Sequence, residues 1–224
     1  MLGPRFRGMA CVIGRSGDRA MDQRREQRWL GIGGLVFVAI LLVAVFTTPN
    51  KDSHLSAADA VKFFQDHKTA VQVSAWFTAL AIVVGIFFFW FLRRHLATGE
   101  SRWGLENVGF VGGVIFGVGG GIAAGLKLAL ADGVGHVDPI VIQSLNVLFN
   151  NLAMIVTGTG VALFLIGNGI TVTRSSTLPH WLGWAGVVIG VLSIVGPGAP
   201  LAGLWILVAS VLLIVRARST AAAA

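Results

Sequence analysis

The sequence predicts an all-α membrane protein: a polytopic helical bundle of six transmembrane helices with both termini in the cytoplasm. Two observations predict the class, since 55% of the residues are hydrophobic and only 12% are charged. A soluble domain usually carries about 25% charged residues. A third observation is that the apolar residues form long runs between short polar segments, so we expect lipid around most of the chain.

The chain begins with a basic, polar segment at residues 1–28. We expect a flexible cytoplasmic tail there, because it has few apolar side chains to bury. The apolar run 29–47 follows. A basic segment before an apolar run is also typical of a signal peptide, but this run is long and no small-residue cleavage site follows it. We therefore place the six-helix membrane domain at 29–216 and a short cytoplasmic tail at 217–224.

The longest predicted loop, residues 48–69, lies on the outer side of the membrane. Ser56 precedes Asp59 by three residues, which is typical of a helix N-cap with an acidic residue in the first turn. The apolar residues Val61, Phe63 and Phe64 then favour a short amphipathic helix on the membrane surface.

Five further apolar runs complete the predicted membrane domain. They cover residues 70–92, 108–130, 139–170, 181–195 and 201–215. A helix of the length of either of the last two reaches only about 22 Å at 1.5 Å per residue. The hydrocarbon core is about 30 Å thick. A re-entrant hairpin is therefore the alternative to two crossings at the C-terminal end.

Charge predicts the orientation. With a cytoplasmic N-terminus, every arginine falls in an inner segment, and the four lysines lie in outer segments or near the outer end of a span. This is the positive-inside pattern, and it predicts a multi-pass protein of the plasma (inner) membrane. A net charge of +7 would suggest nucleic acid as a partner of a soluble protein. Here orientation explains the charge, and we expect no nucleic acid.

The third span carries a row of glycines spaced four residues apart: Gly109, Gly113, Gly117, Gly121 and Gly125. Residues at this spacing share a helix face, and small faces let helix backbones approach closely in lipid. The row predicts a helix-packing face. Its partner is another helix of the same chain or a second subunit, and a glycine-lined water path is the remaining alternative.

A candidate polar site lies near the outer ends of the third and fourth spans. Lys127 is the charged residue inside a span, and Gln143, Asn146 and Asn150 form a stripe at similar depth. Polar groups in a span face protein or water, because an unpaired amide in lipid costs several kcal/mol. The stripe is either hydrogen-bonding glue between helices or a solute pathway. Lys127 either extends its ammonium to the surface or serves as a cation in that pathway.

The motifs of catalysis and cofactor binding are missing from the sequence. No serine-hydrolase, phosphate-loop or dinucleotide motif occurs in a suitable context, and the five histidines have no metal-ligand spacing. We therefore predict no catalytic residues, no cofactor and no metal, and an enzyme is the less favoured reading.

Two stretches carry a family resemblance: HLSAADAVKFFQDHKTAVQVSAW at 54–76 and LPHWLGWAGVVIGVLSIVGP at 178–197. They resemble small six-span actinobacterial membrane proteins of unknown function, over about residues 50–215. The resemblance implies six spans and a bacterial plasma membrane. It transfers no activity and no functional residue.

Two function classes remain. The first hypothesis is a structural or accessory subunit of a membrane complex, whose partner is another membrane protein or a second copy of the chain. The alternative is a small-solute or ion transporter or channel that uses Lys127 and the amide stripe.

Overall fold

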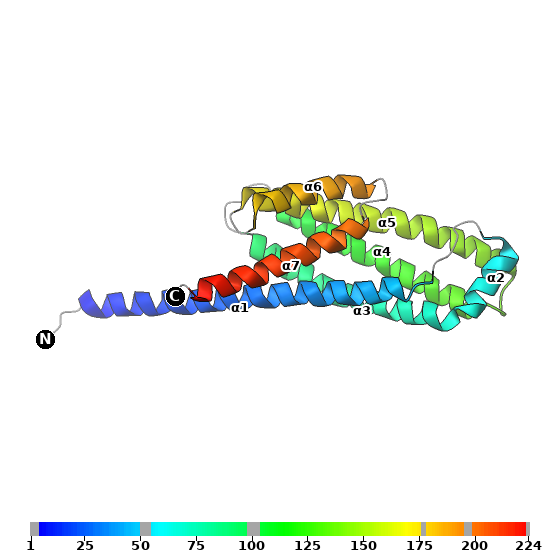
Figure 1. Ribbon diagram of the computed structural model, residues 1–224, viewed down its shortest axis with the longest axis horizontal. Coiled ribbons are helices and arrows are strands. Elements are labelled where there is room, and N and C mark those ends of the chain that lie inside the picture. Colours follow the sequence, from blue (N-terminus) through cyan, green and yellow to red (C-terminus); the bar gives the residue numbers. More distant parts are fainter. Residues whose placement is uncertain (1–4, 50–54, 98–103, 176–177, 195–198, 223–224) are drawn as a thin grey trace.

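The computed structural model of the chain describes residues 5–49, 55–97, 104–175, 178–194 and 199–222, and every regular element in these ranges is an α-helix (Figure 1). The prediction of an all-α fold is confirmed. The helices are α1 (Arg5–Phe46), α2 (Ala57–Asp66), α3 (Lys68–Leu96), α4 (Leu105–Gly133), α5 (Pro139–Arg174), α6 (His180–Ile194) and α7 (Ala199–Ala222).

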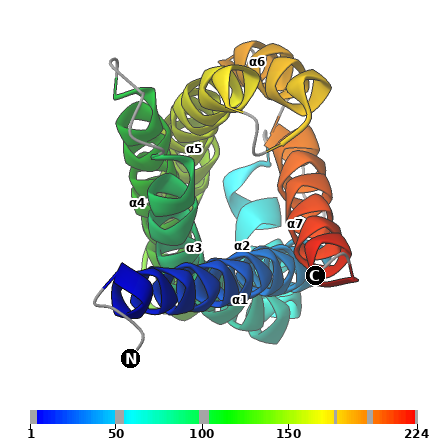
Figure 2. The same ribbon diagram turned by 90° about the vertical axis from the view of Figure 1, so that its left-hand side faces the viewer.

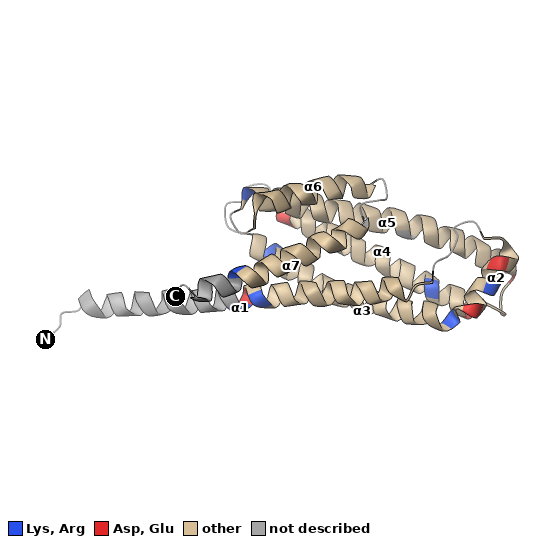
Figure 3. Cartoon of the chain, viewed as in Figure 1, with Lys and Arg blue, Asp and Glu red and all other residues tan. Residues whose placement is uncertain are grey.

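Four helical segments are long and apolar enough to cross a membrane: Arg25–Phe46 of α1, and the whole of α3, α4 and α5. The apolar parts of the last two helices, His180–Ile194 and Pro200–Arg216, are shorter. Among the described residues, charged side chains gather at the two ends of the bundle (Figure 3). We call these the α2 end and the arginine end, the latter marked by four arginines at the ends of helices or of their apolar parts: Arg25, Arg93, Arg174 and Arg216.

The two predicted tails are largely helical. Helix α1 begins at Arg5 and runs without a break into the apolar segment, and α7 continues to Ala222. Residues 19–28 contain neither glycine nor proline and consist mostly of strong helix formers such as arginine, glutamine and glutamate. This composition lets the helix extend beyond the apolar run. The expectation of a flexible tail considered only the lack of apolar side chains to bury, and the structure has a helix in this segment instead.

Helix α2 begins where the sequence predicts. The Ser56 hydroxyl accepts a hydrogen bond from the Asp59 backbone N–H and donates one of 2.6 Å to the Asp59 carboxylate. We expected the apolar face of α2 to lie on the membrane surface. In the structure this face packs onto the bundle. Ala60 and Phe64 are buried against residues of α3, α4 and α5, and α2 lies across the ends of these helices (Figure 1).

The bundle is held together by direct backbone contact between α4 and α5. A Cβ atom on Gly160 would meet the backbone of Phe116, and one on Gly167 would meet the backbone of Gly109. No side chain separates the two helices at these points, so they pack as closely as small residues in lipid allow. Helix α3 packs on the other side of α4, and α1 packs between α3 and α7 (Figure 2).

Helix α6 follows only one half of α5. Near the arginine end, Gly183 of α6 lies against Gly169 of α5, and at its other end the Ser193 carbonyl lies beside Gly158. Gly158 is in the middle of α5, about 28 Å along the helix from Pro139. Helix α6 therefore ends, and α7 begins, at half the depth of α5, far from the α2 end (Figure 1).

Candidate functional site

Lys127 belongs to α4, and its side chain reaches toward α3 and the segment that follows α1. Its ammonium donates hydrogen bonds to the Thr48 hydroxyl at 2.9 Å and to the Ser74 hydroxyl at 3.1 Å. Each hydroxyl gives its own proton to a backbone carbonyl, that of Ala44 for Thr48 and that of Val71 for Ser74. Both hydroxyls therefore act as acceptors toward Lys127, and the third N–H of the ammonium remains for another acceptor.

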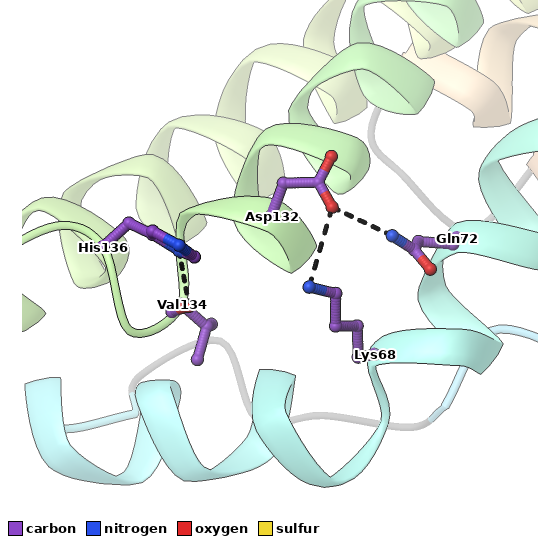
Figure 4. Close-up of polar contacts among 5 residues, drawn as sticks. All are labelled: Lys68, Gln72, Asp132, Val134 and His136. Carbon is purple, nitrogen blue, oxygen red and sulfur yellow. Dashed lines mark hydrogen bonds and ion pairs between the residues drawn. The ribbon is translucent and has the colours of Figure 1, made fainter.

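No carboxylate in the described part of the chain forms an ion pair with Lys127. Asp132 lies five residues further along α4 and points to another face of the helix. Its carboxylate accepts a hydrogen bond of 2.9 Å from Gln72 and lies 3.9 Å from the Lys68 ammonium (Figure 4). In the described part of the chain, the hydrogen-bond partners of the Lys127 ammonium are two neutral hydroxyls.

A cavity of about 240 Å³ opens beside Lys127 and extends toward the arginine end. Its polar lining consists of Lys127, Thr48, Thr78 and Thr157, and the remainder is apolar or glycine. Four phenylalanines from four helices form much of the wall: Phe37, Phe89, Phe116 and Phe164. Ala202, Gly203 and Ile206, from the first turns of α7, close the end of the cavity away from Lys127. The cavity thus has one cationic end and a long apolar body.

The predicted amide partners of Lys127 do not line this cavity. Gln143 donates a hydrogen bond of 3.0 Å to the Leu55 carbonyl and so fixes the segment that leads into α2. Asn146 is 1% exposed, and the amide nitrogen of Asn150 is buried without an acceptor. The depth of the amides along the bundle explains why they do not line the cavity. Lys127 and Phe149, the neighbour of Asn150, border the same small space under α2. The amides therefore lie level with Lys127 or nearer α2, whereas the cavity extends the other way.

The predicted glycine face is divided among three surroundings. Gly109 lies against Asn168 of α5, and Gly113 and Gly117 lie against Phe89 and Ile82 of α3. Gly121 and Gly125 are exposed, and nothing lies within 4 Å of the Cβ position of Gly125. A four-residue step turns about 40° more than a full helical turn, so the row winds around α4 and leaves the interface.

Several residues of the site and of the packing escaped the sequence argument. Thr48 follows the end of α1 and Ser74 lies in α3, and no spacing rule connects them to Lys127 in α4. Gly160 and Gly167 carry a detectable signal, since glycines seven residues apart lie on one helix face. This pair in the fourth span therefore predicts a second small packing face, in addition to the row in the third span.

Comparison with known proteins identifies no relative. No family model, no curated protein and no solved structure matches the chain.

Proposed function

We propose that the protein is a membrane-embedded binding protein that carries a small molecule in the cavity beside Lys127. The observation that carries this proposal is an ammonium at the end of an apolar cavity, with no carboxylate partner among the residues that the structure describes. An ionisable residue at membrane depth is costly and usually serves function. The proposal keeps the transport hypothesis of the sequence but places the ligand beside Lys127 instead of along the amides.

The proposed orientation has the arginine end in the cytoplasm and the α2 end outside, following the positive-inside pattern. In this frame α1, α3, α4 and α5 cross the membrane, and α6 with α7 forms a re-entrant hairpin from the cytoplasmic side. The support is that α6 ends beside Gly158 in the middle of α5. The family resemblance supports the plasma membrane of a bacterium as its location.

Filling the cavity tests the proposal. Gly203 lines the cavity, and nothing lies within 4 Å of its Cβ position, so Gly203→Leu adds bulk without a clash at the backbone. Gly125→Leu is the matched control, because its Cβ position is equally free but outside the cavity. Native mass spectrometry of gently extracted protein would detect a retained small molecule.

The proposal predicts a bound molecule in the wild type and in Gly125→Leu, and its loss in Gly203→Leu. It is contradicted when the wild type retains nothing, or when Gly203→Leu retains the molecule at the wild-type level.

A second candidate function is the accessory subunit, and one observation favours it. The α2-end half of the glycine row, Gly121 and Gly125, faces outward together with exposed Ala129. A partner helix would find a small, close-packing face there. On this view Gly125→Leu dissociates a co-purifying protein or a second copy of the chain, whereas Gly203→Leu leaves the assembly intact. The same two variants thus separate the two functions.

A further inference from the structure

The ligand class follows from the unbalanced charge at the end of the cavity. Lys127 uses two of its N–H groups on Thr48 and Ser74, and both acceptors are neutral. In surroundings of low dielectric constant an ammonium without a counter-charge is expensive, and an anion that accepts the third N–H removes much of this cost. Hydrogen bonds between charged groups are also about twice as strong as neutral ones.

The remainder of the cavity requires an apolar body. Away from Lys127 and the three threonines, the lining consists of phenylalanine, aliphatic residues and glycine. An inorganic anion would leave this surface unfilled. The volume of about 240 Å³ lies just below the range of about 300–1,000 Å³ that is usual for drug-sized ligands. A single chain or a small ring fits this volume better than a two-chain lipid.

The route from water is narrow. On the α2 side of Lys127, Phe63 and Phe64 of α2 cover the space between the helix ends. The cavity between these described residues has a volume of about 20 Å³. Such a space holds about one water molecule and does not pass a larger solute.

The side of the bundle that faces lipid is more open. Helix α7 contacts α1 near the arginine end, where Gly31 and Gly34 lie against Ser210. Toward the α2 end α7 diverges from α1 and stops at half depth (Figure 1), and the described backbones of α1 and α5 do not pack directly against each other. Val45, which is 58% exposed, and Gly203 border the cavity along this gap. In the proposed membrane frame this gap faces lipid, and it is the entry that the cavity lining supports, between α1 and the start of α7.

The depth of Lys127 agrees with such an entry. Its partner Ser74 is two residues from Trp76, which is 67% exposed. Exposed tryptophan in a membrane helix is typical of the boundary between headgroups and hydrocarbon. Lys127 therefore lies close to this boundary but inside the bundle, between α3 and α4, and the apolar body of the cavity extends to the depth of acyl chains.

We infer that the cavity takes a single-chain amphipathic anion, with a carboxylate or phosphate head on Lys127, which enters sideways from the leaflet at the α2 end. This inference rests on the proposed function and names its ligand class. The chain of the ligand would point toward Ala202 and Ile206 of α7.

Photo-labelling tests the ligand class. The full chain is reconstituted in phosphatidylcholine vesicles with hexadecanoic acid that carries a diazirine in mid-chain, or with the matched hexadecanol or hexadecylamine. Peptide mapping after illumination then locates the label. The expected result is labelling by the acid on the cavity segments 116–127 and 202–206, at least about 10-fold above labelling by the amine.

Three variants connect the label to the ammonium. Lys127→Gln should reduce labelling by the acid about 10-fold, to the level of the alcohol, and Lys127→Arg should retain most of it. Lys68→Gln removes a second lysine near the α2 end that does not line the cavity, and should change nothing. Size-exclusion profiles and thermal melting of each variant confirm that the protein is folded.

Equal labelling by acid and amine, or full labelling of folded Lys127→Gln, overturns the inference. If no probe labels the cavity while Gly203→Leu still abolishes retention of a natural molecule, the ligand class is wrong and the binding function stands. If Gly203→Leu changes nothing as well, the binding function also fails.

Discussion

The two sides of the bundle use glycine in opposite ways. Between α4 and α5, Gly160 and Gly167 bring two backbones into contact, and the cavity residues Phe116, Thr157 and Phe164 lie along that contact line. Between α1 and α7, glycines produce contact only near the arginine end, and Gly203 borders open space. The α4–α5 side of the molecule is therefore closely packed, and the α1–α7 side leaves space beside Gly203.

The largest loss of stability should come from adding a bulky side chain between α4 and α5. Gly167→Val places a branched side chain against the backbone of Gly109, which cannot move without separating α4 from α5. Overpacking of this kind costs about 1–3 kcal/mol and sometimes more. We expect at least about 3 kcal/mol here, seen as loss of folded protein or a large fall in Tm. A wild-type melting curve for Gly167→Val would show that the two backbones are not in close contact.

A smaller effect of opposite sign is expected at Asn150. Its amide nitrogen is buried without an acceptor. An unsatisfied buried polar group costs about 1–3 kcal/mol, so Asn150→Leu should leave stability unchanged or raise it by about 1 kcal/mol. Thermal melting in detergent measures the change. A folded variant with a clearly lowered Tm would mean that the amide has a partner of energetic importance.

The helix that covers the α2 end should respond to the loss of its cap. Ser56→Ala removes the hydroxyl that accepts from the Asp59 N–H, and such caps are worth about 1 kcal/mol. Hydrogen exchange should become faster by about 5-fold in Ala57–Asp66 and remain unchanged in α4 and α5. Equal acceleration across all helices would show that α2 is not a separate local unit.

The smallest change should occur on the exposed part of the glycine row. Gly125→Ala meets nothing within 4 Å and improves helix propensity by up to about 1 kcal/mol. Its Tm should be equal to or slightly above that of the wild type. A large destabilisation would place a partner on this face and favour the accessory-subunit function.

The fold was largely predictable because it depends on composition and on local signals. Each of the six apolar runs forms a helix, and the Ser56 cap begins α2. Four of the six segments have the length and composition to cross a membrane. The length of the fifth apolar run predicted that α6 would be short. The position of its end beside Gly158 depends on tertiary packing, which cannot be derived from the sequence of this run.

The site was predictable only in part. Lys127 stands out because a charge inside an apolar run is costly, and it does line the cavity. Gln143, Asn146 and Asn150 do not line the cavity with it, because these amides lie level with Lys127 or nearer α2, whereas the cavity extends the other way. Thr48 and Ser74 come from segments distant from Lys127 in the sequence. The glycine row packs against described residues at Gly109, Gly113 and Gly117 and is exposed at Gly121 and Gly125, because a four-residue repeat winds around a helix with 3.6 residues per turn.

The most direct test of the account is a high-resolution electron cryo-microscopy map of the wild-type chain extracted with its native lipids, compared with the same map of Lys127→Gln. The account predicts elongated density in the cavity, with one end at the Lys127 ammonium and the other near Ala202, and its absence in the variant. An empty or collapsed cavity in the wild type, with the ammonium turned toward α2 and water, would contradict it.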